Sequence, residues 1–419
     1  MTISNNTVWE IRAAGVETNG GGFKDLNPGT SVDYSQQDAA QLALTDLASD
    51  GAGTGITSVT GGFTAAMEGN CIYIAGTGWT TGWYQITGYT DTNTITIDRT
   101  ASANQTGGTG NVGGAWLFKS SLNALFFNTT NKGSYNKAWV KSGTYSGATV
   151  LGSSSWTLAR SYFTLQGYVT TRGDFPIGTD RPLLDFGVTD ATISWTGGYA
   201  HLLNMRLDKQ RTSGSRTIYI AGSSSTLRNC KITRSGYNTQ ACLMGGTYAR
   251  VFQCEFVSTL GPAFQFAQEY GYMSFCYIHD SVNGVSFSGG NALGCTVENS
   301  IIDTCTGLGI SLYYGGQAFG NTIYNCGTGF AVSSTYYNAA VNNIFHSCTT
   351  ALTAKEETYS DNNCFYNNGT DRSGGVVAGE NDIGADPLLT DPANQDFSLA
   401  ANSPCFNTAV KLGVAVGLP

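Results

Sequence analysis

The amino-acid sequence predicts an all-β protein whose larger part is a right-handed parallel β-helix, preceded by a small antiparallel β-domain and one capping helix. The main observation is a short segment that recurs at steps of about 20–25 residues, the spacing of a solenoid. Inside each copy the pattern alternates with a period of two, as in a β-strand. Turn-forming pairs such as Asn283-Gly284 separate the copies. The copies begin at Asn204, Asn229, Gln253, Phe275, Asn299, Asn321, Asn342 and Asn362.

Each copy contributes to two columns of residues that we expect to face the core. The fourth position is large and apolar, and the second is mostly small. No helical period occurs inside a copy, which excludes leucine-rich and helical-hairpin arrays. The large column consists of Leu207, Ile232, Phe256, Ile278, Ile302, Tyr324, Phe345 and Phe365. The small column consists of Cys230, Cys254, Cys276, Ser300, Thr322, Asn343 and Asn363.

The chain before the repeats is predicted to form a separate module. Its strands are expected at 8–12, 71–75, 82–87 and 94–98, which suggests a small antiparallel barrel or sandwich. A short helix is expected within residues 33–47, and a glycine-rich linker at 107–114. The predicted parts are therefore a β-rich domain at 1–115, a capping helix and linker at 116–136, the β-helix at 137–368 and a C-terminal capping segment at 369–419.

Both predicted caps follow from the need to close the ends of a solenoid. Ser120 or Ser121 can cap a helix whose apolar face includes Leu122 and Phe126, and such a helix would cover the open first coil. After Asn368 the repeat stops, and the prolines that follow preclude ladder pairing. We expect this last segment to close the far end or to lie along a flank.

Charge and composition exclude several classes of function. The net charge is −8 and the isoelectric point is about 4.9, whereas a nucleic-acid-binding protein needs a basic surface. No apolar run is long enough to span a membrane. The first residues lack the basic and apolar regions of a secretory signal, which predicts synthesis in the cytoplasm or release by cell lysis. The sequence predicts no cofactor, and neither nucleic acid nor membrane as a partner.

The eleven cysteines are predicted to be reduced residues of the core. Their number is odd, and stacked strands lie about 4.8 Å apart, a distance that a disulfide can bridge. Side chains in register point the same way, however, which suits a ladder of small apolar residues better than bridged pairs. With no Cys-x-x-Cys pair and only three histidines, no metal site is predicted. The two columns are Cys230, Cys254 and Cys276, and Cys305, Cys326 and Cys348.

Motifs at both ends of the predicted solenoid resemble those that bracket right-handed parallel β-helix proteins, a group that includes polysaccharide lyases and bacteriophage tailspikes. The entry motif is Trp-Val-Lys-Ser-Gly-Thr-Tyr at 139–145, and the exit motif runs from Ala385 to Pro404. The N-terminal sequences Val8-Trp9-Glu10, 18–23 and 33–38 are similar to those of phage virion structural proteins. The resemblance implies a homotrimer, docked to the capsid or another virion protein through residues 1–115 and assembled in the host cytoplasm.

The fifth position of the repeat places His279, Asp303, Asn325 and His346 in one outward column. A carboxylate between two imidazoles could perform acid–base chemistry on a glycan, so His279, Asp303 and His346 are weak catalytic candidates. The alternative is a polar ladder that satisfies backbone groups at a strand end. No second carboxylate stands in this column, although glycosidases require a pair. In a lyase, Arg206 or Lys231 could be the base and Asp208 or Glu255 could hold calcium, but the sequence lacks the cluster of acidic residues that calcium needs.

The third position predicts an outward apolar ridge formed by Tyr277, Ile301, Ile323 and Ile344. Burying such side chains gains about 1.5–3 kcal/mol each, so we expect something to cover them. One candidate is the terminal segment around Leu388, Leu389 and Phe397. The other is a neighbouring subunit of a trimer.

The first functional hypothesis is a bacteriophage virion structural protein that decorates the capsid or forms a short spike. The alternative is a tailspike-type depolymerase, a hydrolase or lyase acting on host surface polysaccharide. A weaker alternative is a glycan-binding adhesin without catalysis. Turn aromatics would stack on sugars in the last two cases, or pack on the outside of the rod. These aromatics include Trp79, Trp83, Tyr313, Tyr314, Tyr336 and Tyr337.

Overall fold

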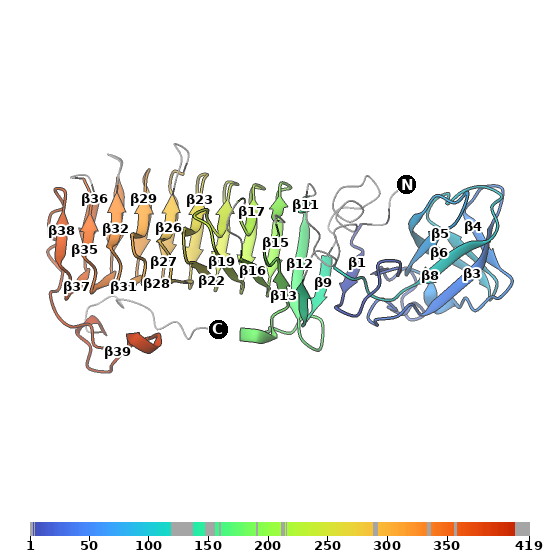
Figure 1. The fold of residues 1–419 in the computed structure, drawn as a ribbon, viewed down its shortest axis with the longest axis horizontal. Helices are drawn as coiled ribbons and strands as arrows, with labels where there is room; N and C mark the ends of the chain where they lie inside the picture. The colour runs from blue at the N-terminus through green and yellow to red at the C-terminus, as the bar shows by residue number, and fades with distance from the viewer. Residues whose placement is uncertain are drawn as a thin grey trace. The chain divides into compact units, whose positions relative to one another are not determined.

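The computed structural model consists of two compact units. The N-terminal unit comprises residues 1–152 and 159–184, and the C-terminal unit comprises residues 153–158 and 185–419. The predicted all-β fold is confirmed, with an antiparallel barrel in the first unit and a parallel β-helix in the second (Figure 1). Of the capping helix and linker predicted at 116–136, the residues from 119 on lie outside the described part of the chain, and Trp116, where the helix was expected to begin, forms a parallel bridge to Ile11. The structure describes residues 3, 5–118, 137–146, 156–158, 161–189, 192–210, 214, 216–287, 292–332, 337–355 and 358–406.

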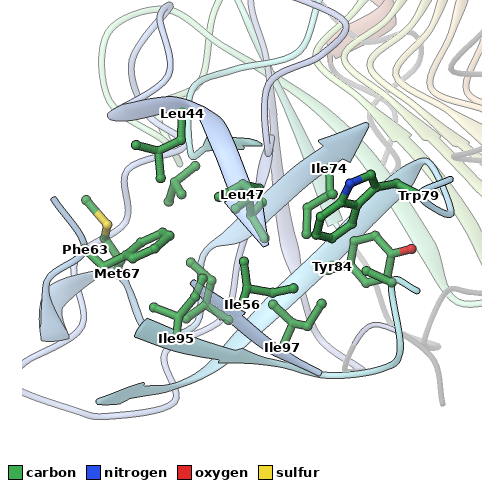
Figure 2. Packing of buried hydrophobic residues seen from close by; sticks show 14 residues of the cluster. Leu44, Leu47, Ile56, Phe63, Met67, Ile74, Trp79, Tyr84, Ile95 and Ile97 are labelled. Atoms are coloured by element: carbon green, nitrogen blue, oxygen red, sulfur yellow. The ribbon is translucent and has the colours of Figure 1, made fainter. Parts of the chain in front are cut away.

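Six antiparallel strands of the N-terminal unit close into a barrel in the order β3-β4-β7-β6-β5-β8. Alternation drives its assembly, because one face of each strand must be buried. Leu47, Ile56 and Ile95 are fully buried at its centre (Figure 2). The strands are β3 (Leu42–Ser49), β4 (Gly55–Ser58), β5 (Cys71–Ala75), β6 (Gly82–Asp91), β7 (Thr94–Ile97) and β8 (Gly108–Val112), and a 3-10 turn, η1 (Ala65–Met67), precedes β5.

Two expectations for this module are wrong. Residues 42–49 form strand β3 where a short helix was expected, since Leu44 and Leu47 are needed in the barrel core. The glycine-rich stretch at 107–114 contains strand β8 where a linker was expected. A side chain at Gly110 would place its Cβ 2.5 Å from Leu47 Cδ1, so this glycine permits close packing inside the sheet.

Strand β1 (Val8–Ile11) forms as predicted, but it pairs with the strands that follow the barrel in sequence. It lies parallel to β9 (Lys137–Lys141), which in turn pairs in parallel with β12 (Phe163–Tyr168). A short strand, β2 (Gly22–Phe23), pairs antiparallel on its other side. The barrel is thus inserted in the chain between two neighbouring strands of one sheet. The unit also contains β10 (Thr144–Ser146) and the 3-10 turn η3 (Gly178–Asp180), and β13 (Leu183–Asp185) spans the point where the chain enters the second unit.

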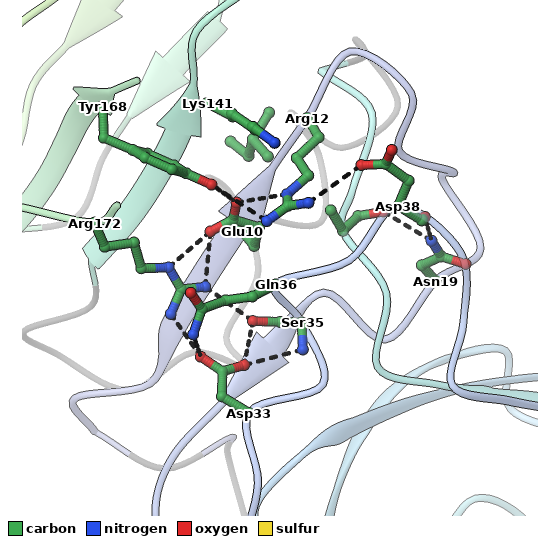
Figure 3. Close-up of polar contacts among 12 residues, drawn as sticks. Glu10, Arg12, Asn19, Asp33, Ser35, Gln36, Asp38, Lys141, Tyr168 and Arg172 are labelled. Atoms are coloured by element: carbon green, nitrogen blue, oxygen red, sulfur yellow. Dashed lines mark hydrogen bonds and ion pairs between the residues drawn. The ribbon is translucent and has the colours of Figure 1, made fainter. Parts of the chain in front are cut away.

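A buried ionic network joins β1 to β12 and to the loop at 33–38 (Figure 3). The carboxylate of Glu10 is completely buried and pairs with Arg12 at 2.8 Å and Arg172 at 2.7 Å. Tyr168 donates its hydroxyl to Glu10, and Arg172 also binds Asp33 at 2.5 Å. A buried carboxylate is tolerated here because two cations and a hydroxyl replace its water.

Three parallel sheets make up the C-terminal unit, and each coil contributes one strand to each sheet (Figure 1). Sheet I contains β15 (Ala200–Leu203), β18 (Thr226–Arg228), β21 (Arg250–Phe252), β24 (Tyr272–Ser274), β27 (Thr296–Glu298), β30 (Gln317–Phe319), β33 (Asn338–Val341) and β36 (Thr358–Asp361). Sheet II contains β16 (Arg206–Gln210), β19 (Lys231–Ser235), β22 (Glu255–Ser258), β25 (Tyr277–His279), β28 (Ile301–Asp303), β31 (Thr322–Tyr324), β34 (Ile344–His346) and β37 (Cys364–Tyr366). Sheet III contains β11 (Trp156–Leu158), β14 (Ile193–Trp195), β17 (Ile218–Ile220), β20 (Cys242–Met244), β23 (Pro262–Phe266), β26 (Asn283–Phe287), β29 (Leu308–Leu312), β32 (Thr328–Val332), β35 (Thr350–Thr353) and β38 (Thr370–Ser373).

The repeat copy predicted to begin at Asn321 begins one residue earlier. The first residue of each copy turns the corner between sheets I and II in the left-handed region, with φ of 48° at Asn299 and 62° at Gly320. Glycine adopts this conformation more easily than asparagine, which explains the substitution. Strand pairing agrees, because Ile302 lies opposite Ile323 and Ile323 opposite Phe345. Ile323 therefore belongs to the inward column, in the place predicted for Tyr324.

The same shift puts Asn321 into a buried asparagine ladder in place of Thr322. Asn321 donates its side-chain amide to Asn343 Oδ1 at 3.0 Å, and Asn343 donates to Asn363 Oδ1 at 3.2 Å. Each side chain also binds backbone of the preceding coil, as Asn343 does at Ala318 O. The ladder satisfies polar groups at a corner where sheet hydrogen bonding is interrupted.

All eleven cysteines are free and buried. The columns of Cys230, Cys254 and Cys276 and of Cys305, Cys326 and Cys348 lie at the two ends of the sheet II strands. Burial raises the pKa of Cys254 well above that of an ordinary thiol. Such thiols are poor nucleophiles, so these residues act as packing groups.

The chain after the last coil forms a short antiparallel pair, β39 (Leu389–Asp391) and β40 (Asp396–Leu399). Two 3-10 turns, η4 (Pro392–Asn394) and η5 (Pro404–Phe406), flank β40. Ile383 forms a parallel bridge to Cys364, so the segment also continues the last coil. In the described part of the chain, no helix has the length and apolarity to cross a membrane.

Candidate functional site

The outward face of sheet II carries the polar residues predicted as catalytic candidates, but these residues do not form one hydrogen-bonded cluster. Tyr324, which was predicted to face inward, occupies the place expected for Asn325, between Asp303 and His346. Asp303 accepts hydrogen bonds from Tyr277 at 3.1 Å and Thr304 at 2.5 Å. Within the described chain, no hydrogen bond links Asp303 to either predicted histidine.

The two histidines have separate partners. His279 Nε2 lies 3.1 Å from Glu255 Oε1, and its Nδ1 lies 2.7 Å from Asp280 Oδ2. His346 binds the hydroxyl of Ser347 at 2.8 Å. Burial would lower the pKa of His279, but the hydrogen bonds and charges of Glu255 and Asp280 outweigh it and raise that pKa. Burial lowers the pKa of His346, so the pKa values of the two imidazoles are shifted in opposite directions.

Glu255 is the centre of the strongest polar cluster on this face. It pairs with Lys231 at 2.6 Å as well as with His279. Burial would raise the pKa of Glu255, but hydrogen bonds from His279 and Lys231 lower it to about 2. The carboxylate is thus held between two cationic groups and is a poor general base. Across the described residues, no group of three or more His, Cys, Asp or Glu could hold a metal ion.

The predicted apolar ridge needs two corrections. Ile323 points inward and is fully buried, because of the one-residue shift at Gly320. Tyr277, Ile301 and Ile344 do lie on the outer face of sheet II, but the C-terminal segment covers them. Phe397 packs against Tyr277 and Ile301, with Tyr324 and Leu389 beside them, and Ile344 packs with Cys364, Cys405, Ile383 and Leu399. The terminal segment, one of the two predicted covers, therefore accounts for this surface.

A second candidate surface lies at the corner between sheets III and I, and the sequence reasoning missed it. Tyr248 and Tyr270 occupy equivalent positions in consecutive coils, where the Tyr248 amide donates to Glu269 O. Their rings are stacked, with centroids 5.1 Å apart and planes inclined by 13°. They remain 54% and 45% exposed, so the stack faces solvent.

The tyrosine pair borders a shallow groove of about 320 Å³ on the outer face of sheet I. Its floor includes Phe252 and Tyr272, whose ring centroids lie 5.6 Å apart. Arg250 completes the lining. The Tyr272 hydroxyl donates to Glu298, and burial together with this bond raises the pKa of Tyr272. The groove thus combines four aromatic rings with one guanidinium group.

A signal for this groove exists in the sequence. Tyr248 and Tyr270 are 22 residues apart (270 − 248), the same step as between Gln253 and Phe275 (275 − 253). Among the turn aromatics that were singled out, Trp79 and Trp83 are buried, whereas Tyr337 is exposed. Tyr313 and Tyr314 pack on each other at 4.6 Å, and Tyr336 lies outside the described residues.

Comparison with known proteins supports the fold. A family model described as "Right handed beta helix region" matches residues 189–318. The structure is similar to that of pectate lyase Pel9A, with a TM-score of 0.50 and 13% identity over 72% of this chain and 90% of that one. For the tailspike protein gp49 of Pseudomonas phage LKA1, the TM-score is 0.22 and the identity 11%, over 92% of this chain and 70% of that one. For the catalytic domain of GH87 alpha-1,3-glucanase in complex with nigerose, the TM-score is 0.25 and the identity 8%, over 82% of this chain and 90% of that one. A search of curated proteins found no match.

Proposed function

From a right-handed β-helix with an exposed aromatic groove, we propose that this protein binds a polysaccharide. The observation that carries the proposal is the solvent-facing stack of Tyr248 and Tyr270. Tyrosine presents a broad apolar face and a polar hydroxyl, which suits the faces and hydroxyl groups of sugar rings. Because Tyr248 and Tyr270 stand on consecutive coils, the pair can contact consecutive units of a linear polymer.

The backbone at this corner supports a role for the two rings beyond packing. Tyr248 and Tyr270 both have a φ of 56°, in the left-handed region that disfavours bulky residues. Later coils place Gly294 and Gly315 at the same corner, with φ of 64° and 58°. Unusual backbone conformations persist where the surrounding structure enforces them, often at functional sites. The two tyrosines stand at a corner that glycine would fit with less strain.

Binding is favoured over cleavage by the arrangement on sheet II. In the described residues, the hydrogen bonds of Asp303 go to Tyr277 and Thr304, and Glu255 is neutralised by Lys231 and His279. Glycosidases need two carboxylates about 5–10 Å apart across the scissile bond. The name of pectate lyase Pel9A states a polysaccharide substrate for a similar fold, which supports the ligand class. The depolymerase hypothesis is tested by measuring new sugar ends after incubation with any polymer that binds.

The test is a screen of the full-length protein against immobilised bacterial and plant polysaccharides, followed by calorimetry on those that bind. Tyr248→Ala and Tyr270→Ala should each weaken binding about tenfold, since one stacking face is lost. Tyr359→Ala is the matched control, because Tyr359 is an exposed tyrosine of strand β36 outside the groove. Unchanged affinity in both tyrosine variants, or no polymer bound, would overturn the proposal.

A second proposal concerns location, and it rests on the N-terminal motifs that resemble those of phage virion proteins. We propose that the chain is a tailspike-like part of a phage particle, attached through residues 1–115 and assembled as a homotrimer in the host cytoplasm. The network around Glu10 supports it, because residues of two of these motifs, Glu10 and Asp33, bind Arg172 beside strand β12. These ion pairs connect the proposed attachment module to a residue that follows strand β12.

Light scattering and particle analysis test this second proposal. A trimer should have three times the chain mass of 44.2 kDa, whereas a mass of 44.2 kDa in solution would overturn the trimer. Peptides of the chain should appear in mass spectra of purified particles from the host that carries it. Their absence from particles, with the protein present in the lysate, would overturn the virion location.

A further inference from the structure

We propose that the polysaccharide is acidic, and that Arg250 binds its carboxylate groups. This inference rests on the proposed function and names the ligand class of the same groove. The side chain of Arg250 lines the groove together with the four aromatic rings and is exposed to solvent. Along the strand, it stands between Tyr248 at the corner and Phe252 on the groove floor. A sugar ring stacked on the tyrosines would therefore place its substituents beside the guanidinium.

Within the described part of the chain, Arg250 has no carboxylate partner. Among the described residues, no hydrogen bond or ion pair reaches its guanidinium, whereas Arg12, Arg99 and Arg372 each pair with a carboxylate. The chain has 29 acidic and only 21 basic residues, so acidic side chains are plentiful. An arginine left unpaired beside a groove in such a chain is available for a ligand.

The strands beside Arg250 also carry polar and charged groups that have partners of their own. Tyr272, opposite Arg250 in the neighbouring strand, donates its hydroxyl to the carboxylate of Glu298. Arg228 lies opposite Phe252 in the strand on the other side and donates to the neutral amide of Gln253 at 3.4 Å. The Arg250 guanidinium can therefore face an anion without first breaking an ion pair with a described residue.

The geometry of the guanidinium group also favours a carboxylate as its ligand. A guanidinium is planar and presents paired N–H donors that match the two oxygens of a carboxylate. A neutral sugar hydroxyl would use only one donor and gain less. Aromatic neighbours reduce the water around the pair, which strengthens a charge-assisted hydrogen bond. The groove is thus suited to uronic acids or other sugars bearing carboxylates, with rings on Tyr248 and Tyr270 and the acid group on Arg250.

The experiment compares polymers that differ only in charge. Full-length protein is titrated calorimetrically with oligosaccharides of polygalacturonate, alginate and hyaluronan, and with the carboxyl-reduced form of each. At least one acidic form should bind at least tenfold more tightly than its reduced form, and more weakly as salt is added. Arg250→Gln should bring the ratio of the two affinities close to one. Lys355→Gln, which removes an exposed charge several coils away, is the control and should change neither.

The outcomes separate this inference from the proposed function. If neutral polymers bind with the same affinity as acidic ones, and Tyr270→Ala weakens both, the groove is a sugar site without acid selectivity and the inference fails alone. If Arg250→Gln binds an acidic polymer like the wild type, the inference also fails. If no acidic polymer binds at all, it is overturned as well. Circular dichroism melts of each variant should match the wild type, since both substituted side chains are exposed.

Discussion

Phe397 of the C-terminal segment lies with its ring centroid 6.2 Å from that of Tyr277, and this contact covers the patch of Tyr277 and Ile301 on the outer face of sheet II. Ile301 is buried in this cluster, and the patch is consequently not available to another subunit. We predict that Phe397→Ala destabilises the protein by about 3 kcal/mol, the usual cost of removing a buried phenylalanine. The measurement is chemical denaturation, and Phe406→Ala, an exposed phenylalanine of the same segment, should cost less than about 1 kcal/mol.

The same variant tests what the segment protects. Removing the Phe397 ring exposes Tyr277 and Ile301, which should promote self-association visible by light scattering. A variant with wild-type stability and mass would show that the segment does not hold this face.

Asn343 is predicted to be the most sensitive member of the asparagine ladder. It accepts bonds from Asn321 and donates to Asn363 Oδ1 and Ala318 O, so Asn343→Ala leaves several buried groups without partners. We expect a loss of about 2–3 kcal/mol, because each unsatisfied buried group costs about 1–3 kcal/mol and partial relaxation recovers some of it. Gln317→Ala, on an exposed position of β30, should change stability by less than about 0.5 kcal/mol. Equal effects of the two substitutions would contradict the role of the ladder.

This ladder also shows where sequence reasoning stops. The period of the repeat fixed the fold class, because a column of large apolar residues every coil can be buried only in a solenoid. The register failed in one copy, since Gly320 replaces the corner asparagine and Asn321 then imitates it one position later. A shift of one residue exchanges inward and outward faces, which moved Ile323 from the core to the predicted ridge.

The groove was missed for a different reason. Its residues come from a corner and two strands of sheet I, outside the segment on which the copies were aligned, and pairing across coils brings Arg250 and Tyr272 together. Only the shared step of Tyr248 and Tyr270 is visible in the sequence. The covering of the sheet II face by Phe397 was one of two alternatives that composition alone left equal.

Stability should depend on pH through the pair of Glu255 and His279. The pKa of Glu255 falls from 4.5 to about 2 in the folded state, so its contribution is present above pH 4.5 and is lost as the pH falls from 4.5 towards 2. The pKa of His279 is raised above 6.5, so its contribution is present below pH 6.5 and is lost as the pH rises through the folded value. Both are present together from about pH 4.5 to 6.5.

Melting curves between pH 2 and 8 check this dependence. Glu255→Gln should lose up to about 3 kcal/mol at pH 5–6 and show a flatter pH profile, with a smaller difference from the wild type below pH 3. Glu380→Gln, an exposed glutamate of the same unit, should keep the wild-type profile. Parallel profiles for wild type and Glu255→Gln would contradict the ionic contribution of this pair.

Most of the cysteines should be unreactive towards thiol reagents in the folded protein. All eleven are buried, and burial raises the pKa of residues such as Cys242 well above the ordinary thiol value. A colorimetric thiol reagent should find few reactive groups in native protein and eleven after denaturation without reductant. Fewer than eleven in the denatured, unreduced protein would reveal disulfides and contradict the reduced core.

Glu10 is expected to control the integrity of the N-terminal unit. Its carboxylate is completely buried between Arg12 and Arg172, and Glu10→Ala would leave both cations facing a buried, uncharged space. Removing one partner of a buried ion pair typically costs about 3–5 kcal/mol, and Asp33, which still pairs with Arg172, offsets part of this. Hydrogen exchange should therefore accelerate in peptides covering β1 and β12, while peptides of sheet II exchange as in the wild type.

Asp25→Asn is the matched control for that measurement, because Asp25 is an exposed acidic residue of the same unit and should leave exchange unchanged. Arg172→Gln should reproduce the effect of Glu10→Ala, since it breaks the bonds to both Glu10 and Asp33. Arg12→Gln should have a smaller effect, because Tyr168 and Arg172 continue to satisfy the Glu10 carboxylate. If all three variants exchange like the wild type, the network does not stabilise β1 beside β9 and β12. The attachment proposed for residues 1–115 would then lack its rigid connection to the strands that follow.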